Sequence, residues 1–135
     1  MFLDTSALKA VYDVDDEHHP EASALMDSIK ARTTEVSSFL TSDYVLDEAI
    51  TLTRFALNHG KALELADAVL SSKFVRVVYV GKDVFASALE MFRQRDDKEW
   101  SFTDCVSFAL MESEEVKAAF AFDPHFEQAG FGTMP

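Results

Sequence analysis

The stretch FVRVVYVGKDVFASALEMFRQRDD, residues 74–97, contains the two kinds of element that decide the fold. Its first part, FVRVVYV, is rich in β-branched residues and predicts a buried strand, while KDVFASALEMFRQRDD predicts a helix. The alternation recurs along the chain, with strands expected in 1–4, 36–40 and 117–123. Because alternating strands and helices favour a parallel sheet covered on both faces, we expect a three-layer α/β/α sandwich with a short, mainly parallel central sheet.

The connecting segments complete this prediction. Helices are expected in 7–13, 61–72 and from Ser101 onward, and an acidic loop running into an amphipathic helix is expected in 13–32. The capping cluster at 41–43 precedes a helix that we expect to end at Gly60, and 124–130 predicts a final helical turn. The chain contains no internal repeat, low-complexity tract or linker, which predicts a single domain over residues 1–135.

The composition excludes several classes of protein. Hydrophobic residues make up 48% of the chain and include 12 Phe, which is enough for a packed core. The single cysteine, Cys105, cannot form an internal disulfide, and no Cys/His pair has zinc-finger spacing. No apolar run approaches the span of a bilayer, and segment 1–19 lacks the features of a signal peptide. We therefore expect a cytoplasmic protein without a membrane partner.

The net charge of −12 restricts the choice of partners. This charge argues against a simple basic surface that grips nucleic acid through its phosphates, because such a chain repels RNA at long range. Action on a phosphodiester remains open if carboxylates hold divalent cations, since a bound metal inverts the local electrostatics. A cationic protein is the other partner that this charge favours.

Four acids lie where an α/β sheet binds its ligands. Asp4 ends the first expected strand and Asp123 ends the expected last one, and ligands bind at the carboxyl ends of such strands. Asp104 opens a helix, and Glu48 lies on a largely apolar one. If these acids converge, their mutual repulsion raises their pKa values, and their oxygens suit Mg²⁺ or Mn²⁺.

Asp104 has two readings. Ser101 followed three positions later by an acid is typical of a capped helix start. The following residues are almost entirely apolar, which places Asp104 near the interior, where an unpaired charge is costly. The carboxylate therefore needs a partner from elsewhere in the chain.

Four motifs together resemble the PIN domain family, and within it the VapC-type toxin ribonucleases of bacterial and archaeal toxin–antitoxin pairs. They are FLDTSAL (2–8), TSDYVLDEAITLTR (41–54), DKEWSFTDCVSFALM (97–111) and AFAFDPHFEQAGF (119–131). Each motif alone is weak, but their order and their helix-sized spacing cover nearly the whole chain. The chain departs from the family pattern at Ala121, where many relatives carry Thr, and its first strand begins almost at the chain start.

The resemblance implies a Mg²⁺- or Mn²⁺-dependent endoribonuclease, the toxin of a type II pair. Its catalytic and metal-binding acids are Asp4, Glu48, Asp104 and Asp123, with Ser6 in support. Asp4 and Asp104 are expected to contact metal directly, Glu48 to hold or deprotonate a water molecule, and Asp123 to complete an outer shell. Ser101 is expected to support Asp104 as the helix cap. The implied partners are an RNA substrate, a small antitoxin with a basic or amphipathic segment, and a second copy of the chain.

Other candidates have structural explanations. The adjacent His18 and His19 favour an exposed loop pair, and Cys105 favours a small buried hydrophobe. Trp100 is typical of packing, although stacking on a base stays open. Two interpretations of His125 stay open: a packing or capping role, and a side chain that approaches the site. Solvated surface charge is the preferred interpretation of the basic residues near the acidic segments, which are Arg54, Arg93, Arg95 and Lys98.

Two alternative functions remain open at this stage. A phosphatase with an aspartate nucleophile after its first strand needs a second acid two residues on, where this chain has Ser6. A non-catalytic acidic α/β module that binds a basic protein is the other alternative. In such a module, the positions of the four acids near the interior would be a coincidence. Metal-dependent cleavage of RNA would favour the nuclease over this module.

Overall fold

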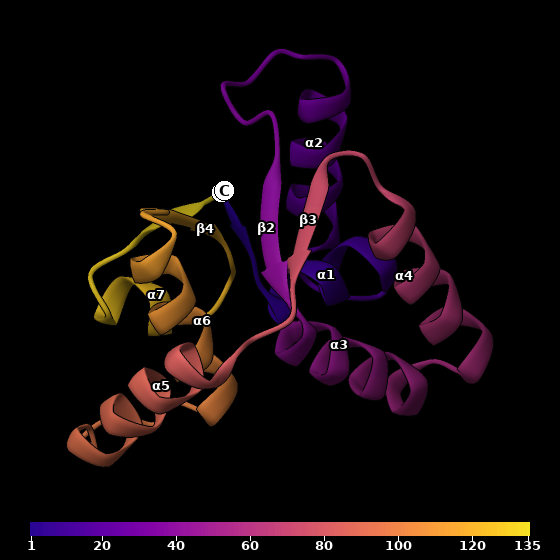
Figure 1. Cartoon of the computed structure of the whole chain (residues 1–135). Coiled ribbons are helices and arrows are strands. Elements are labelled where there is room, and N and C mark those ends of the chain that lie inside the picture. Colours follow the sequence, from indigo (N-terminus) through magenta and orange to yellow (C-terminus); the bar gives the residue numbers. More distant parts are fainter.

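The computed structural model describes residues 1–135 as a five-stranded sheet with seven helices (Figure 1). The strands are β1 (Phe2–Leu3), β2 (Phe39–Ser42), β3 (Val75–Val78), β4 (Ala118–Phe120) and β5 (Gly132–Met134). The helices are α1 (Thr5–Tyr12), α2 (His19–Lys30), α3 (Asp43–Ala56), α4 (His59–Ser71), α5 (Lys82–Gln94), α6 (Phe102–Ser113) and α7 (His125–Gln128). None of these helices is both long and apolar enough to cross a bilayer.

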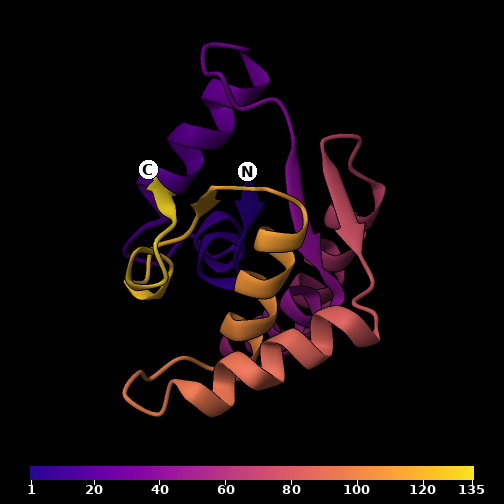
Figure 2. The same ribbon diagram turned by 60° about the vertical axis from the view of Figure 1, so that its left-hand side comes forward.

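The sheet is parallel throughout, in the order β3-β2-β1-β4-β5. The central strand β1 pairs Phe2 with Leu40 on one side and with Ala119 on the other. Helices α1, α2 and α4 lie on one side of the sheet and α6 and α7 on the other, while α5 packs along α6 (Figures 1 and 2). The predicted α/β/α arrangement is confirmed.

Side-chain caps set where several helices begin. Ser42 Oγ accepts the backbone N–H of Val45 at 3.2 Å and so begins α3 directly after β2. Asn58 caps α4 in the same way through the N–H of Lys61, at 2.8 Å. Because Asn58 begins a new helix, Gly60 lies in the first turn of α4. The expected helix end at Gly60 is therefore wrong, since α3 already stops at Ala56.

Helix α6 lies at the centre of the core. Every residue from Asp104 to Met111 is buried, so this helix has no solvent-facing side over two turns. Phe108 packs edge-on against Trp100 and Phe126, with ring centroids 5.0 and 5.1 Å apart. The apolar surroundings expected for Asp104 are confirmed.

Three strand predictions need correction. The stretch FVRVVYV contains β3, but β3 is one of the two edge strands of the sheet, and its valines are only partly buried while Arg76 is exposed. The last strand is β5 rather than β4. Its sequence, GTM, carries no strand pattern, and it exists because Gly132 to Met134 pair with Ala118 to Phe120. Strand β2 also lies later than expected, at Phe39–Ser42.

Candidate functional site

Three aspartates come together at the carboxyl ends of β1 and β4. Asp4 follows β1 and caps α1, Asp123 follows β4, and Asp104 lies in the first turn of α6. Asp4 is 3% exposed and Asp104 is 8% exposed, while Asp123 is partly buried. The predicted convergence is thus observed for three of the four acids, because parallel strands end at one edge of the sheet.

Ser6 ties two of these strand ends together. Its hydroxyl donates to Asp4 Oδ2 at 2.7 Å and accepts the backbone N–H of Phe122 at 3.0 Å. The Ser6 N–H also donates to Asp4 Oδ2, at 3.2 Å. One hydroxyl therefore fixes the Asp4 carboxylate and the backbone that leads to Asp123, which gives the predicted supporting residue a defined contact.

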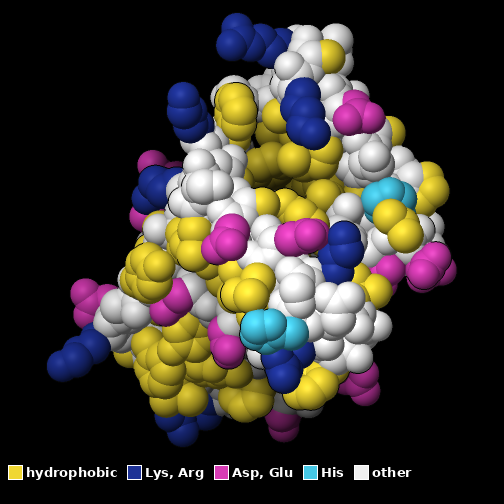
Figure 3. Space-filling model, turned by 90° about the vertical axis from the view of Figure 1, so that its right-hand side faces the viewer, with side chains coloured by type: hydrophobic (Ala, Val, Ile, Leu, Met, Phe, Trp, Pro, Cys, Tyr) yellow, Lys and Arg dark blue, Asp and Glu magenta, His cyan; other side chains and the backbone are white.

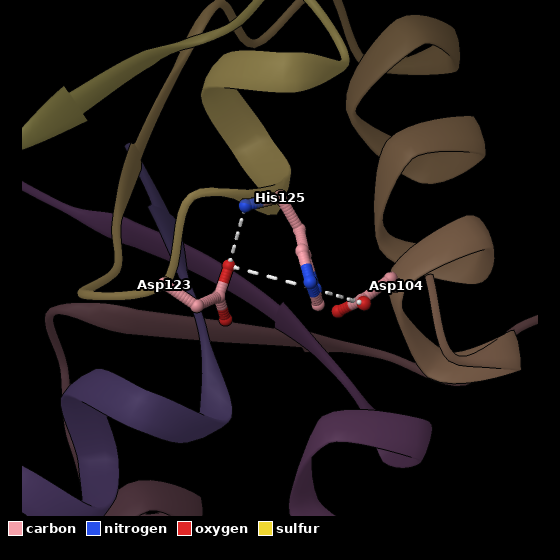
Figure 4. Close-up of side chains that lie close together, drawn as sticks. All are labelled: Asp104, Asp123 and His125. Carbon is pink, nitrogen blue, oxygen red and sulfur yellow. Dashed lines mark hydrogen bonds and ion pairs between the residues drawn. The ribbon is translucent and has the colours of Figure 1, made fainter. Parts of the chain in front are cut away.

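Asp104 is both a helix cap and a partner of His125. The Ser101 N–H donates to Asp104 Oδ2 and the Asp104 N–H donates to Ser101 Oγ, each at 3.0 Å, which is a capping box. His125 Nδ1 lies 2.7 Å from the same Oδ2 (Figure 4). When Asp104 is ionised, its carboxylate can only accept, and Nδ1 then carries the hydrogen in this pair. Asp104 therefore caps α6 and also has the partner that its buried position requires, while its role as a metal ligand stays a prediction.

His125 also faces Asp123. Its backbone N–H donates to Asp123 Oδ1 at 3.0 Å, and Nδ1 lies 3.9 Å from that oxygen (Figure 4). Asp104, Asp123 and His125 each offer one ligand atom, and these atoms all lie within 4.8 Å of one another. The open question about His125 is thereby settled: its ring points into the acidic site.

Glu48 is not joined to this cluster. It lies in the second turn of α3, half-buried, and no hydrogen bond or ion pair links it to Asp4, Asp104 or Asp123. Helix α3 begins directly after β2, at the same edge of the sheet. The catalytic role of Glu48 stays a prediction.

The electrostatics of the site disfavour three full negative charges. The pKa of Asp4 is raised to about 7, chiefly by burial; the hydrogen bonds from Ser6 oppose this rise, and the nearby charges of Asp123 and Asp104 add to it. Burial also raises the pKa of Asp104, to which the charge of Asp123 adds, while the bonds from Ser101 and His125 oppose it. No lysine or arginine forms an ion pair with any of these aspartates. The site therefore gains either a proton or another cation.

The donor set fits a divalent cation. Two carboxylates and an imidazole lie close enough to share one ion, and carboxylate oxygens are the ligands that Mg²⁺ and Mn²⁺ prefer. The Thr5 hydroxyl, directly after Asp4 in the chain, is buried without a hydrogen-bond partner.

The remaining candidates have structural roles. His18 stacks on Phe122 with ring centroids 4.3 Å apart, and His19 Nδ1 contacts the Ala10 carbonyl at 2.7 Å, so the expected exposed loop pair is wrong. Trp100 is buried and donates to Gln128 Oε1 at 3.0 Å, which makes it a packing residue. Cys105 is a buried small hydrophobe, as expected, and burial raises the pKa of its thiol.

Comparisons with known proteins show which family this chain resembles. The model of the PIN domain matches residues 1–132. The chain is 35% identical to the 23S rRNA-specific endonuclease VapC20 of Mycobacterium tuberculosis over 131 residues, which cover 97% of this chain and 95% of that protein. It is 26% identical to a VapC ribonuclease of Archaeoglobus fulgidus over 132 residues, covering 96% and 81% of the two chains.

Solved structures show the same fold. The crystal structure of M. tuberculosis VapC20, described as a toxin that cleaves the sarcin-ricin loop, superposes with a TM-score of 0.87 and 34% identity over 96% of this chain and 95% of that chain. FitAcB of Neisseria gonorrhoeae is similar in fold alone, with a TM-score of 0.69 and 16% identity over 99% and 96% of the two chains.

Proposed function

The chain belongs to the PIN domain family, and we propose from this premise that it is a VapC-type toxin that hydrolyses RNA phosphodiester bonds with the help of Mg²⁺ or Mn²⁺. The observation that carries the proposal is the set of three aspartates from separate segments, with His125 as their only ion-pair partner. A helix-capping role alone explains neither the burial of Asp4 nor the turn of His125 into the site. The non-catalytic interaction module gains no support.

The residues that would bind a metal ion are held in position by other residues of the chain. Asp104, Asp123 and His125 would hold the ion, with Asp4 beside them, and Glu48 would act from α3. A bound divalent ion supplies Lewis-acid polarisation of the phosphodiester and neutralises charge on the leaving oxygen. Ser6 and Ser101 orient Asp4 and Asp104, so that both carboxylates are held in place before substrate arrives.

The proposed activity predicts RNA cleavage that depends on added metal. Purified protein treated with EDTA should leave a labelled single-stranded RNA intact, and Mn²⁺ or Mg²⁺ should restore cleavage, because the carboxylates then gain the positive charge that they lack. The measurement is the rate of product formation on a gel. Equal cleavage in EDTA would contradict metal dependence, and no cleavage of RNA with either ion would favour the interaction module.

The proposed toxin also has protein partners. The three aspartates lack a lysine or arginine, so an antitoxin that places a basic side chain there would form charge-assisted hydrogen bonds with them. Such a contact would exclude both metal and substrate from the site. The charge of −12 favours a cationic partner for the same reason.

Helix α5 provides a surface for a second copy of the chain. Phe85, Leu89 and Phe92 recur on one face and are 41%, 39% and 47% exposed, whereas Ala88 is the only buried residue of the helix. Phe85 and Phe92 both pack edge-on against Phe102, so this face continues the core outward. A contiguous apolar face of this kind is typical of an interface.

We therefore predict a homodimer at micromolar concentration that depends on α5. Leu89→Glu should convert the dimer to a monomer, because it places a charge in the middle of the apolar face. Light scattering with size-exclusion chromatography measures the mass. Leu63→Glu on α4 is the matched control, since Leu63 is 49% exposed and should leave the dimer intact. A parent that is monomeric throughout this range would overturn the prediction.

A further inference from the structure

Three adjoining hollows lie at the amino ends of the strands, at the edge of the sheet opposite the aspartates. They have volumes of about 590, 420 and 350 Å³. Met1, Ser38, Phe74 and Lys117 line them, and each of these residues directly precedes one of the strands β1 to β4. The hollows meet around segment 34–38, which contributes to all three. We call this continuous surface the amino-end groove.

Positive charge gathers in two of the three hollows of the amino-end groove, whereas the third carries Glu35 and Glu115 beside Lys117. Of the 12 lysines and arginines in the chain, five line the groove: Lys30, Arg32, Lys73, Arg76 and Lys117. Only Arg76 forms an ion pair, with Glu114 at 2.8 Å. No carboxylate lines the two hollows that contain Lys30 with Arg32 and Lys73 with Arg76. Figure 3 shows lysine and arginine side chains around a hollow with apolar walls at the end of the molecule that carries the α2–β2 connection.

An aromatic ring stands between these cations. Phe74 is 55% exposed and lines both hollows that lack a carboxylate, so it lies between Lys30 with Arg32 and Lys73 with Arg76. The hydroxyls of Thr34, Ser37 and Ser38 line the same surface. Cations and hydroxyls bind phosphate oxygens, while an exposed aromatic ring stacks on unpaired bases. This combination matches single-stranded nucleic acid better than it matches an acidic peptide, which offers no base to stack.

We propose that the amino-end groove is a second RNA-binding site. It binds the backbone of a part of the substrate that lies far from the scissile bond, while the scissile bond itself lies at the acidic edge. This inference rests on the proposed ribonuclease activity. It accounts for how a chain of net charge −12 retains a polyanion, because a local positive surface attracts phosphates that the rest of the molecule repels. The acidic edge then needs to bind only the nucleotides around the scissile bond.

The test compares a long and a short RNA. A domain of this length has a radius of gyration of about 14 Å, so an RNA of about four nucleotides cannot contact both edges of the sheet whereas one of about 30 can. The groove variant carries Arg32→Gln and Lys73→Gln. The matched control carries Lys61→Gln and Arg93→Gln, which remove the same charge from cations that pair with glutamates on their own helices.

We expect the groove variant to raise KM for the long RNA about tenfold, with kcat unchanged, and to leave cleavage of the short RNA at the parental rate. Loss of two phosphate contacts should also lower the slope of log affinity against log salt by about 1.4. Phe74→Ala should weaken binding of the long RNA about tenfold through lost stacking. The control pair should match the parent in each measurement. A groove variant that matches the parent on the long RNA would overturn the proposal.

Two further outcomes separate this inference from the proposed function. If the parent cleaves neither RNA, the proposed function fails. Fluorescence anisotropy with the labelled long RNA then still tests whether the amino-end groove binds RNA. Weaker binding by the groove variant than by the parent supports the inference, and equal binding overturns it. If polyglutamate binds the parent through Arg32 and Lys73 while RNA does not, the groove recognises an acidic protein segment and the proposal is wrong.

Discussion

Asp104→Asn is expected to abolish metal-dependent RNA cleavage while the protein stays folded. Asparagine keeps an oxygen that can accept the Ser101 N–H, so the helix start should survive. The substitution removes one negative charge from the candidate ligand set, and the cleavage rate should fall at least about a hundredfold. Metal binds only the folded site, so Mn²⁺ should raise the melting temperature of the parent and do much less for the variant. Gel cleavage and thermal melts measure the two effects.

Substitutions of His125 serve as the matched comparison. His125→Ala removes both a candidate metal ligand and the Nδ1 bond that orients Asp104, and metal affinity or activity should fall at least about 10- to 100-fold. The side-chain amide of His125→Asn reaches as far as Nδ1 and should preserve more of the activity than alanine does. An Asp104→Asn protein that cuts RNA at the parental rate, with the parental shift in melting temperature, would reduce Asp104 to a helix cap.

Asp4→Asn should stabilise the metal-free protein at alkaline pH and remove much of its pH dependence. The pKa of Asp4 is about 7 in the folded state and ordinarily 3.8. At pH values between these two, the folded protein therefore keeps a proton on Asp4 that the unfolded chain has lost. The resulting stability is fully present below the unfolded pKa and is lost as the pH rises through 7. Between about pH 5.5 and 8 the metal-free parent should therefore lose roughly 2 kcal/mol, whereas Asp4→Asn should lose little.

Denaturant melts in EDTA at the two pH values measure this effect. Asp27→Asn removes an equal charge from an exposed position on α2 and should keep the parental pH dependence. Saturating Mn²⁺ should stabilise the parent at pH 8 in place of the proton, and should do less for Asp4→Asn. RNA cleavage by Asp4→Asn should be lost at every pH. Identical pH dependence in the parent and Asp4→Asn would show that Asp4 titrates normally.

The sequence was sufficient to predict the sheet edge and three of its acids. Strand–helix alternation implies parallel strands, and parallel strands bring their carboxyl ends together, so Asp4 and Asp123 meet. Asp104 was predicted because it is a charged residue within an apolar stretch, and a buried charge requires a partner. The position of Glu48 relative to the others depends on how α3 packs, which its apolar neighbours do not determine.

Other features depend on tertiary contacts that no local pattern shows. His125 follows Asp123 by two residues, and only the packing of α7 against α6 turns its ring toward Asp104. Strand β5 forms because β4 offers it a free edge, although GTM has no strand pattern. Gly60 appeared to end a helix because glycine commonly does so, but Asn58 begins another helix two residues earlier. In each case a neighbouring segment outweighed the local signal.

The burial of α6 on every side bears on how this protein can be switched off. We expect the buried residues of this helix to exchange their amide hydrogens mainly when the whole domain opens, as core helices commonly do. Asp104 lies in the first turn of this helix, so its position is as persistent as the native state itself. An inhibitor cannot work by loosening this part of the site without unfolding the chain. We therefore expect control to act by occupying a surface that binds metal, RNA or a second copy of the chain, or by degrading the protein.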